Sequence, residues 1–267
     1  VYSILMSCQK AHMKISIVTA VLNREDTISS AIESLRRQTF TQFEHLIQDG
    51  CSTDGTLDEV RRCTDDRSSV VSEPDSGIYD AINKGIARAT GEVIGLLHSD
   101  DILGSNEVLA KVCEALCDPT VQGVYGDLEY VSASDPSRVI RHWHAGKYDF
   151  RRLAKGWMPP HPTLFLRREV FDHWGAYDIN YEIAADYDAV LRWLGRGGVS
   201  LAYIPEVLVK MRVGGESNRS LSRILRKSRE DYRALRSNNV GGVGTLALKN
   251  MSKIRQFFVR QSDHEKA

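Results

Sequence analysis

The stretch 93-VIGLLHSDDIL-103 decides the fold prediction, because an apolar run of strand length ends directly in a polar cluster. Residues 93–97 have the composition of a buried strand, and the polar residues 98–101 follow where the chain leaves the core. Two ionised carboxylates side by side, Asp100 and Asp101, repel each other, and their burial is costly unless a cation or hydrogen bonds hold them. The pair therefore either lies in water or binds something.

The sequence on both sides of this stretch alternates strands with helices. Apolar, β-branched runs at residues 13–21, 43–49 and 69–73 have the composition of strands. The helices expected from apolar residues at helical spacing cover 25–38, a segment starting at Thr56, 78–90 and 106–116. This alternation predicts an α/β fold with a doubly wound, parallel sheet that has helices on both faces.

Polar residues follow four of the expected strands at their carboxyl ends. Asn23, Asp49 and Glu73 lie at or just after the ends of three strands, and Asp100 and Asp101 follow the fourth. Ligands of open parallel sheets bind beyond these ends. We therefore expect the four loops to converge on one crevice, with the aspartate pair facing a ligand.

The second half of the chain is less regular. Two alternating segments, 123–131 and 138–144, predict an antiparallel hairpin. The other elements expected from the pattern are a helix over 186–197, two strands over 199–204 and 207–213 separated at Pro205, and basic helices over 219–238 and 246–259. No linker in the sequence is long enough to separate two independent domains.

The composition is that of an ordinary globular protein. The chain has 267 residues, 42% of them hydrophobic and 26% charged, and no apolar run reaches the roughly 18–20 residues of a membrane span. The five cysteines are odd in number and scattered, which favours reduced thiols in a cytoplasmic protein over a disulfide framework. Residues 1–13 are interpreted as a non-native or extended start.

Charge is distributed unevenly along a chain whose formal net charge is zero. Residues 221–260 contain ten Lys and Arg against two acidic residues, a net charge of +8. Residues 1–220 contain 24 Lys and Arg against 31 acidic residues, a net charge of −7. A basic end on an acidic body indicates an anionic partner for that end.

Each polar candidate in the first half also has an ordinary structural explanation. Asp100 and Asp101 suit a hard cation such as Mg²⁺ or Mn²⁺ that shares a diphosphate, or else a solvated turn. Asp49 suits an acceptor for a ring N–H such as that of uracil, or else turn chemistry. Lys84 is placed to reach a phosphate, or else belongs to a surface ladder with Asp80.

Candidates in the second half are fewer. Asp186 and Asp188 fall on opposite flanks of the buried helix stripe, so only one of them can point into a site, where it is a candidate general base. His142 and His144 lie two residues apart on one face of a strand, and together with His161 they could form a zinc site. Without a clear fourth ligand, ordinary structural roles are the simpler interpretation of these histidines.

Three quoted segments together resemble a known family. The segments are SIVTAVLNREDTISSAIESLRRQTF (16–40), HLIQDGCSTDGT (45–56) and SEPDSGIYDAINKGIARATGEVIGLLHSDD (72–101). They are similar to the signature of glycosyltransferase family two, which has the GT-A fold, and particularly to its bacterial polysaccharide-building branch. The resemblance covers about residues 14–215. It implies a Rossmann-like, mixed but mostly parallel sheet, a UDP-linked nucleoside diphosphate sugar as donor, a divalent metal and one inverting displacement.

The resemblance assigns roles to residues at matching positions of the first half. The implied nucleotide-sugar contacts are Thr19 and Val21 along the nucleoside, Asn23 and Glu25 beside it, Asp49 at the base, Lys84 near the diphosphate and Asp100 at the ribose or sugar. Asp101 is implied as the ligand of Mg²⁺ or Mn²⁺. Gly50 departs from the family, because a second aspartate is common at its position.

The segments HPTLFLRREVF (161–171) and GAYDINYEIAADYD (175–188) resemble the acceptor half of the family. Asp186 inherits the role of catalytic base, although alanine replaces the glutamate that usually precedes it. His161 and Asp188 are candidates on the acceptor side. The Gln/Arg-X-X-Arg-Trp element of processive synthases is absent, which favours a single hexosyl or N-acetylhexosaminyl transfer.

The resemblance divides the chain into a nucleotide-sugar half (14–104), an acceptor half (105–215) and a basic helical extension (216–267). The extension mixes apolar and basic residues as an interfacial helix on anionic lipid does. Attachment to a membrane would suit a glycan or lipid-linked acceptor. The alternative is a helix that packs on the domain or on a dimer partner. Aromatic residues are too few for a nucleic-acid partner. The competing function is a non-catalytic module that binds sugar nucleotides or glycans.

Overall fold

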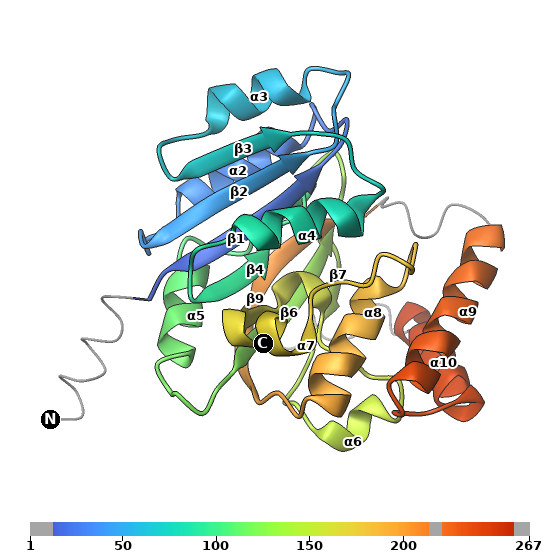
Figure 1. Ribbon diagram of the computed structural model, residues 1–267. Coiled ribbons are helices and arrows are strands. Elements are labelled where there is room, and N and C mark those ends of the chain that lie inside the picture. Colours follow the sequence, from blue (N-terminus) through green and yellow to red (C-terminus); the bar gives the residue numbers. More distant parts are fainter. Residues whose placement is uncertain (1–12, 214–220, 259–267) are drawn as a thin grey trace, which may run out of the picture.

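A nine-stranded sheet forms the centre of the protein (Figure 1). The structure is a computed structural model that describes residues 13–213 and 221–258. Residues 1–12 of the expected extended start and the last nine residues lie outside the described part, whereas Met13, which belongs to that expected start, is buried in the core. The strand order is β3-β2-β1-β4-β8-β6-β9-β5, and β7 pairs with β6. The strands are β1 (Ile15–Val21), β2 (Phe43–Asp49), β3 (Ser68–Ser72), β4 (Val93–Leu96), β5 (Asp101–Leu103), β6 (Gly123–Val131), β7 (Val139–Trp143), β8 (Phe165–Arg167) and β9 (Leu201–Arg212).

Most strands point the same way. β1 is parallel to β2 and β4, and β2 is parallel to β3. β8 lies antiparallel between β4 and β6, and β9 is parallel to β6. β5 and β7 are antiparallel to their neighbours β9 and β6. The predicted mixed, mostly parallel sheet is thereby confirmed.

Helices cover both faces of this sheet, as predicted, because alternate residues of β1 point to opposite sides. Ile17 packs with Leu35 of α2, whereas Val18 packs with Ile82 of α4. The helices are α2 (Ile28–Arg36), α3 (Thr56–Cys63), α4 (Ile78–Arg88), α5 (Val108–Ala115), α6 (Phe150–Leu153), α7 (Arg168–Trp174), α8 (Ala185–Val190), α9 (Leu221–Ser237) and α10 (Val243–Phe258), with a 3-10 turn η1 (His161–Thr163) and a π-helical turn η2 (Leu191–Arg196).

The second half contains the predicted hairpin and one correction. β6 and β7 form the antiparallel pair expected from the sequence. The two strands expected around Pro205 are instead the single strand β9. The pairing of β9 with β6 jumps from Ile204 to Val207, so the proline lies in a bulge where the sheet needs no N–H donor.

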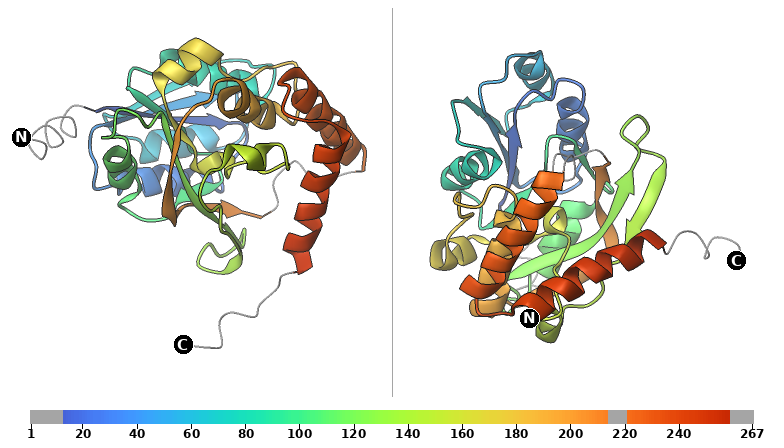
Figure 2. Two further views of the ribbon diagram at one scale, coloured as in Figure 1. Left: turned by 90° about the horizontal axis from the view of Figure 1, so that it is seen from below. Right: turned by 90° about the vertical axis from the view of Figure 1, so that its right-hand side faces the viewer.

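The helices α9 and α10 lie on the side of the molecule that carries α8 (Figures 1 and 2). Ala234 and Leu235 of α9 are fully buried in the same core as Tyr187 of α8. Lys249 of α10 is also buried: its Nζ lies 2.8 Å from Asp231 and 3.0 Å from the centre of the Tyr187 ring. The charge of Lys249 is therefore paired inside the protein, and it is not available to lipid as the sequence pattern suggested.

Among the described cysteines, Cys63, Cys113 and Cys117 are buried and Cys51 is exposed, and these four form no disulfide with one another. No helix in the described part of the chain is long and apolar enough to span a bilayer.

Candidate functional site

The loops that follow β1 and β2 are joined by hydrogen bonds. The backbone N–H of Asn23 donates to Ser52 Oγ at 2.9 Å, and Asn23 Oδ1 accepts from the N–H of Thr53 at 2.9 Å. Asn23 has a φ of 51°, a left-handed conformation that asparagine tolerates better than most residues. The register also places Val21 beside Asp49 at the ends of the two strands. These predicted site residues therefore lie together at one edge of the sheet.

Glu25 connects the first loop to the start of α3. Its Oε2 accepts a 2.7 Å hydrogen bond from the N–H of Gly55, the residue that precedes the helix. The first N–H groups of a helix lack partners within the helix and attract negative charge. A Cβ atom at Gly55 would lie 2.7 Å from the same oxygen, so the glycine permits this close approach.

Thr19 lies inside the sheet and is fully buried. Its hydroxyl donates to the carbonyl of Leu97 at 2.7 Å and lies 2.9 Å from His45 Nε2. Because the hydroxyl has only one proton to donate, it accepts from His45, whose ring proton is therefore on Nε2. Burial lowers the pKa of His45 to about 4. Thr19 thus fixes the backbone just before the aspartate pair.

Asp49 is fully buried, and hydroxyl groups surround its carboxylate. Ser72 Oγ donates to Oδ2 at 2.6 Å, and Ser52 donates through both its N–H and its hydroxyl. The carboxylate is thereby held rigidly at the end of β2. Gly50 follows, and a Cβ there would lie 2.4 Å from Asp75 Oδ2. Asp75 thus supplies a carboxylate beside the position where the family commonly has an aspartate.

Lys84 projects from α4 toward the loop after β3. Its Nζ donates to the carbonyl of Pro74 at 2.7 Å and lies 3.4 Å from Glu73 and 3.8 Å from Asp80. The side chain is about one-third exposed. Lys84 therefore contacts both Asp80, its expected partner on the helix surface, and Glu73, which was expected at the edge of the crevice.

Asp101 is buried, with an exposed fraction of 1%, and neither carboxylate oxygen has a hydrogen-bond partner. Burial first, and then the charge of Asp100, raises the pKa of Asp101 well above its usual value; Arg212 offsets part of this shift. The Arg212 guanidinium instead donates to the carbonyl of Asp100 at 2.7 Å and to Ser30 Oγ at 2.9 Å. The interpretation of Asp101 as part of a solvated turn is therefore wrong.

A divalent cation fits the unpartnered oxygens of Asp101. Carboxylate oxygens are the ligands that Mg²⁺ and Mn²⁺ prefer, and a cation would compensate the desolvated charge. Two adjacent buried oxygens without donors are unusual in a folded protein. Asp101 is thus suited to hold the metal, with Asp100 on the partly exposed side of the pair.

His98, which precedes the aspartate pair, meets residues of the second half. Its ring centre lies 6.2 Å from that of His161, and His161 Nε2 is hydrogen-bonded to the Tyr177 hydroxyl at 2.8 Å. Burial lowers the pKa of both histidines, to about 4 for His161, while the nearby Asp186 raises them. His98 and His161 therefore lie near each other beyond the end of β4, where the charge of Asp186 acts on both rings and that of Asp100 acts on His98.

Asp186 and Asp188 point to different surroundings, as the helical spacing predicted. Asp188 is buried; its Oδ1 accepts from Asn238 Nδ2 at 2.8 Å and its Oδ2 lies 3.2 Å from Arg192. It therefore joins α8 to α9. Asp186 lies at the start of α8, with Tyr79 as a further neighbour.

Glu230 of α9 was not singled out from the sequence, yet it supports the segment that carries Asp186. Its carboxylate accepts three hydrogen bonds from successive backbone N–H groups, those of Glu182 (3.2 Å), Ile183 (2.9 Å) and Ala184 (2.9 Å). Asp186 follows two residues later. The only signal in the sequence was an acidic residue within a strongly basic helix.

If Asp186 is the base that the resemblance implies, Glu230→Ala should slow the reaction more than it weakens donor binding. Loss of the charged acceptor leaves three N–H groups without their partner and lowers the free energy of unfolding by about 1–3 kcal/mol. Steady-state kinetics and a melting curve measure both effects. Glu182→Gln is the matched control, because Glu182 pairs with Arg226 at the surface and such pairs contribute little. Unchanged kinetics in a less stable Glu230→Ala protein would contradict a positioning role.

Solved structures resemble this fold. The S. aureus protein TarS (residues 1–349), in complex with UDP-GlcNAc, matches with a TM-score of 0.66 and 19% identity over 85% of this chain and 66% of that chain. A mannosyltransferase from Pyrobaculum calidifontis, in complex with GDP-Man and Mn²⁺, matches with a TM-score of 0.62 and 16% identity, over 93% of this chain and 76% of that chain. At this identity the likeness shows the fold alone, which is GT-A.

Sequence relatives show the family. The PGL/p-HBAD biosynthesis glycosyltransferase of Mycobacterium tuberculosis is 31% identical over 208 residues, which cover 76% of this chain and 78% of that protein. An uncharacterized glycosyltransferase of the same species is 31% identical over 181 residues, which cover 67% of this chain and 68% of that protein. The model of the family described as Glycosyl transferase family 2 matches residues 16–175. Because this match spans more than half of the chain, the protein belongs to glycosyltransferase family 2.

Proposed function

We propose that this protein transfers a hexose or N-acetylhexosamine from a nucleoside diphosphate sugar, UDP-linked, to a glycan or lipid-linked acceptor in cell-surface polysaccharide synthesis. The observation that carries the proposal is the buried, unpartnered carboxylate of Asp101 next to Asp100, close to His98, whose pKa is lowered by burial and raised in part by the charges of Asp100 and Asp186. These observations support a base, Asp186, and a cation ligand, Asp101, at the same end of β4. The complexes of the similar structures with UDP-GlcNAc and with GDP-Man and Mn²⁺ support the donor class.

In the proposed reaction Asp186 accepts the proton of the acceptor hydroxyl as that oxygen attacks the anomeric carbon. The bond to the diphosphate breaks on the opposite face, so the configuration inverts. Asp49, Asn23 and Glu25 hold the loops that would bind the nucleoside. A divalent cation on Asp101 would neutralise charge on the departing diphosphate. His161 is neutral at physiological pH, since burial lowers its pKa to about 4, and it therefore contributes hydrogen bonding rather than charge.

A nucleotide-release assay tests the proposal. The purified protein is incubated with UDP-, GDP- and dTDP-sugars in the presence of Mn²⁺ or Mg²⁺, and donor binding is followed in parallel by the melting temperature. We expect one donor to be hydrolysed slowly and to raise the melting temperature only with metal. Binding without turnover, even when acceptor glycans are added, would favour the alternative of a non-catalytic sugar-nucleotide or glycan-binding module. Absence of binding to every donor would overturn the proposed function.

We further propose that the protein works at the cytoplasmic face of an anionic membrane through α10. Val243, Leu248 and Met251 are large apolar side chains of this helix that remain exposed. The basic residues Lys253, Arg255 and Arg260 of the extension also suit an anionic surface. The side chains of Lys253 and Arg255 lie outside the described part, as does the whole of Arg260.

Replacement of Leu248 and Met251 by aspartate should weaken binding to vesicles that contain anionic lipid at least about tenfold. Burial of one such side chain contributes about 1.5–3 kcal/mol, and an added carboxylate repels the anionic surface. Vesicle flotation measures the bound fraction. Leu225→Asp on α9 serves as the control, because Leu225 is at least as exposed as Leu248 and Met251. Equal flotation of all three proteins would contradict membrane binding through α10.

A further inference from the structure

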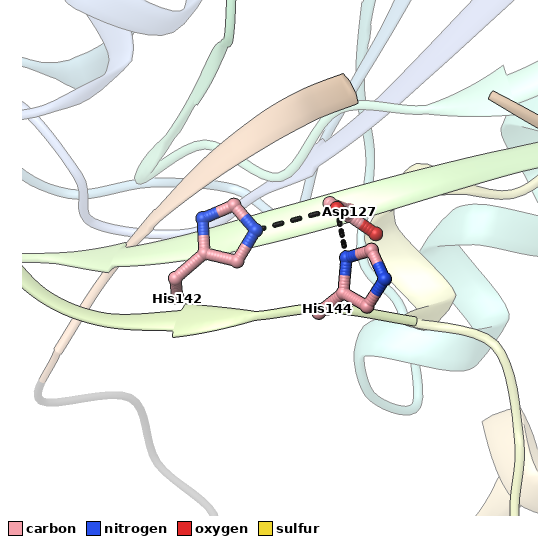
Figure 3. A group of neighbouring side chains, drawn as sticks. All are labelled: Asp127, His142 and His144. Carbon is pink, nitrogen blue, oxygen red and sulfur yellow. Dashed lines mark hydrogen bonds and ion pairs between the residues drawn. The ribbon is translucent and has the colours of Figure 1, made fainter. Parts of the chain in front are cut away.

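The hairpin β6–β7 brings together a carboxylate and two histidines from neighbouring strands (Figure 3). The pairing register continues from Leu128 opposite Trp143, so Asp127 and His144 come next along the ladder. Asp127 Oδ2 lies 2.9 Å from His144 Nδ1 and 3.3 Å from His142 Nε2. The three potential ligand atoms all lie within 4.8 Å of one another. One ion can therefore contact all three after a small adjustment.

The outer partners of this group hold its members in position. Asp127 Oδ1 accepts from the Tyr203 hydroxyl at 2.7 Å and from the N–H of Ala145 at 2.9 Å, which leaves Oδ2 to face the histidines. Glu129 lies 3.6 Å from Nδ1 of His142, on the side of the ring away from Asp127. In protein metal sites, the residues that surround the ligands usually include a carboxylate bonded to the second ring nitrogen of a histidine ligand. They also include hydrogen-bond donors that hold a ligating carboxylate in position.

The group lies on the other face of the sheet from Asp101. Asp101 pairs with Met211, which pairs with Tyr130, so these three side chains share one face. Asp127 differs from Tyr130 by three positions along β6 and therefore points to the opposite face. The inference concerns a separate site and does not depend on the proposed transfer reaction.

We propose that Asp127, His142 and His144 bind a first-row transition-metal ion of the zinc type, with water completing the coordination. Two imidazoles and one carboxylate suit Zn²⁺, Co²⁺ or Ni²⁺ rather than Mg²⁺, which prefers oxygen ligands throughout. The Asp127 side chain is 4% exposed, whereas those of His142 and His144 are 44% and 69% exposed. The ion therefore reaches a buried, oriented carboxylate directly from solvent.

Bound metal would fasten the hairpin to the rest of the acceptor half. Asp127 already holds Ala145 and Tyr203 of β9, and the carbonyl of Ala145 accepts from Trp157 Nε1 at 3.3 Å. An ion that binds only the folded arrangement stabilises it by mass action. The site is thus a structural clamp between β6, β7 and the segment that leads to α6.

The test uses the full chain stripped of metal, in the background of Asp101→Asn and with excess Mg²⁺ so that oxygen-type sites do not contribute. Zn²⁺ is added in a calorimetric titration, and Co²⁺ is added while its visible absorption is recorded. We expect one equivalent of Zn²⁺ to bind, and the intensity of the Co²⁺ absorption to indicate four-coordinate geometry. The double variant His142→Gln, His144→Gln should bind at least about 100-fold more weakly.

Two further variants separate a metal site from a plain hydrogen-bonded cluster. Tyr203→Phe removes a partner of Asp127 without removing a ligand, and it should weaken Zn²⁺ binding about 10–100-fold. His173→Gln replaces an exposed histidine on α7 and should change nothing. If the double variant does not fold, the Co²⁺ spectrum of the protein that retains His142 and His144 shows whether a four-coordinate site forms. Absence of a four-coordinate spectrum, or equal Zn²⁺ binding by the double variant, would overturn the proposal.

Discussion

Asp186→Asn should lower the rate of sugar transfer by about 10²–10⁴-fold while donor binding stays intact. A positioned general base contributes about this factor, equivalent to about 3–5 kcal/mol of barrier. Asparagine has nearly the same shape as aspartate, and within the described part of the chain Asp186 Oδ1 accepts a local hydrogen bond from the N–H of Tyr187. The substitution would therefore remove the proposed proton acceptor and leave the fold of α8 in place.

Single-turnover rates with a saturating donor measure this effect, and the metal-dependent rise in melting temperature reports donor binding separately. Asp172→Asn on the exposed side of α7 is the control for loss of a carboxylate. Asp188→Asn should behave differently, because Asp188 bonds to Arg192 and Asn238. This substitution should lower the free energy of unfolding more than it lowers the rate of sugar transfer. Transfer at the normal rate by a folded Asp186→Asn protein would remove Asp186 from the reaction.

Asp101→Asn should have effects of opposite sign on stability and on function. The buried carboxylate has no hydrogen-bond partner, so a neutral side chain should raise the free energy of unfolding of the metal-free protein by about 1–3 kcal/mol near neutral pH. The same change would remove the proposed cation ligand. Addition of Mn²⁺ and donor should then raise the melting temperature of the unsubstituted protein but not that of the variant.

The stability difference should also depend on pH in a definite direction. Burial and the charge of Asp100 raise the pKa of Asp101 in the folded protein, so the folded state holds this proton more tightly than the unfolded state. The resulting stabilisation is complete below about pH 4, the unfolded pKa, and is lost as the pH rises through the folded pKa. The advantage of Asp101→Asn should therefore grow from pH 4 upward, by at most about 1.4 kcal/mol per pH unit.

Urea unfolding of the two metal-free proteins at several pH values measures this difference. Buried histidines such as His45 titrate in both proteins and cancel in the comparison. A difference that is constant with pH would show that Asp101 ionises normally in the folded state, and the argument for a cation there would lose its physical basis.

Local sequence patterns were sufficient for the parallel half of the sheet. Residues 15–21 and 93–96 are short apolar runs next to helices with clear periodicity, so strand type, helix faces and the polar strand ends all follow from neighbours in sequence. The pattern failed at Pro205, where a local rule predicts a break. The ladder with β6 continues past it through a bulge, and only the partner strand makes that possible.

The sequence by itself determined the class of fold, the family and the edge of the sheet where the candidate site lies, because these depend on periodicity and on ordered motifs. Tertiary structure decided the rest: that Asp101 is buried without a partner, that Glu230 holds the segment before Asp186, and that Asp127 joins His142 and His144. Glu230 acts on backbone 46–48 residues away. Burial and contacts between distant segments arise only when the chain is packed, so no local pattern encodes them.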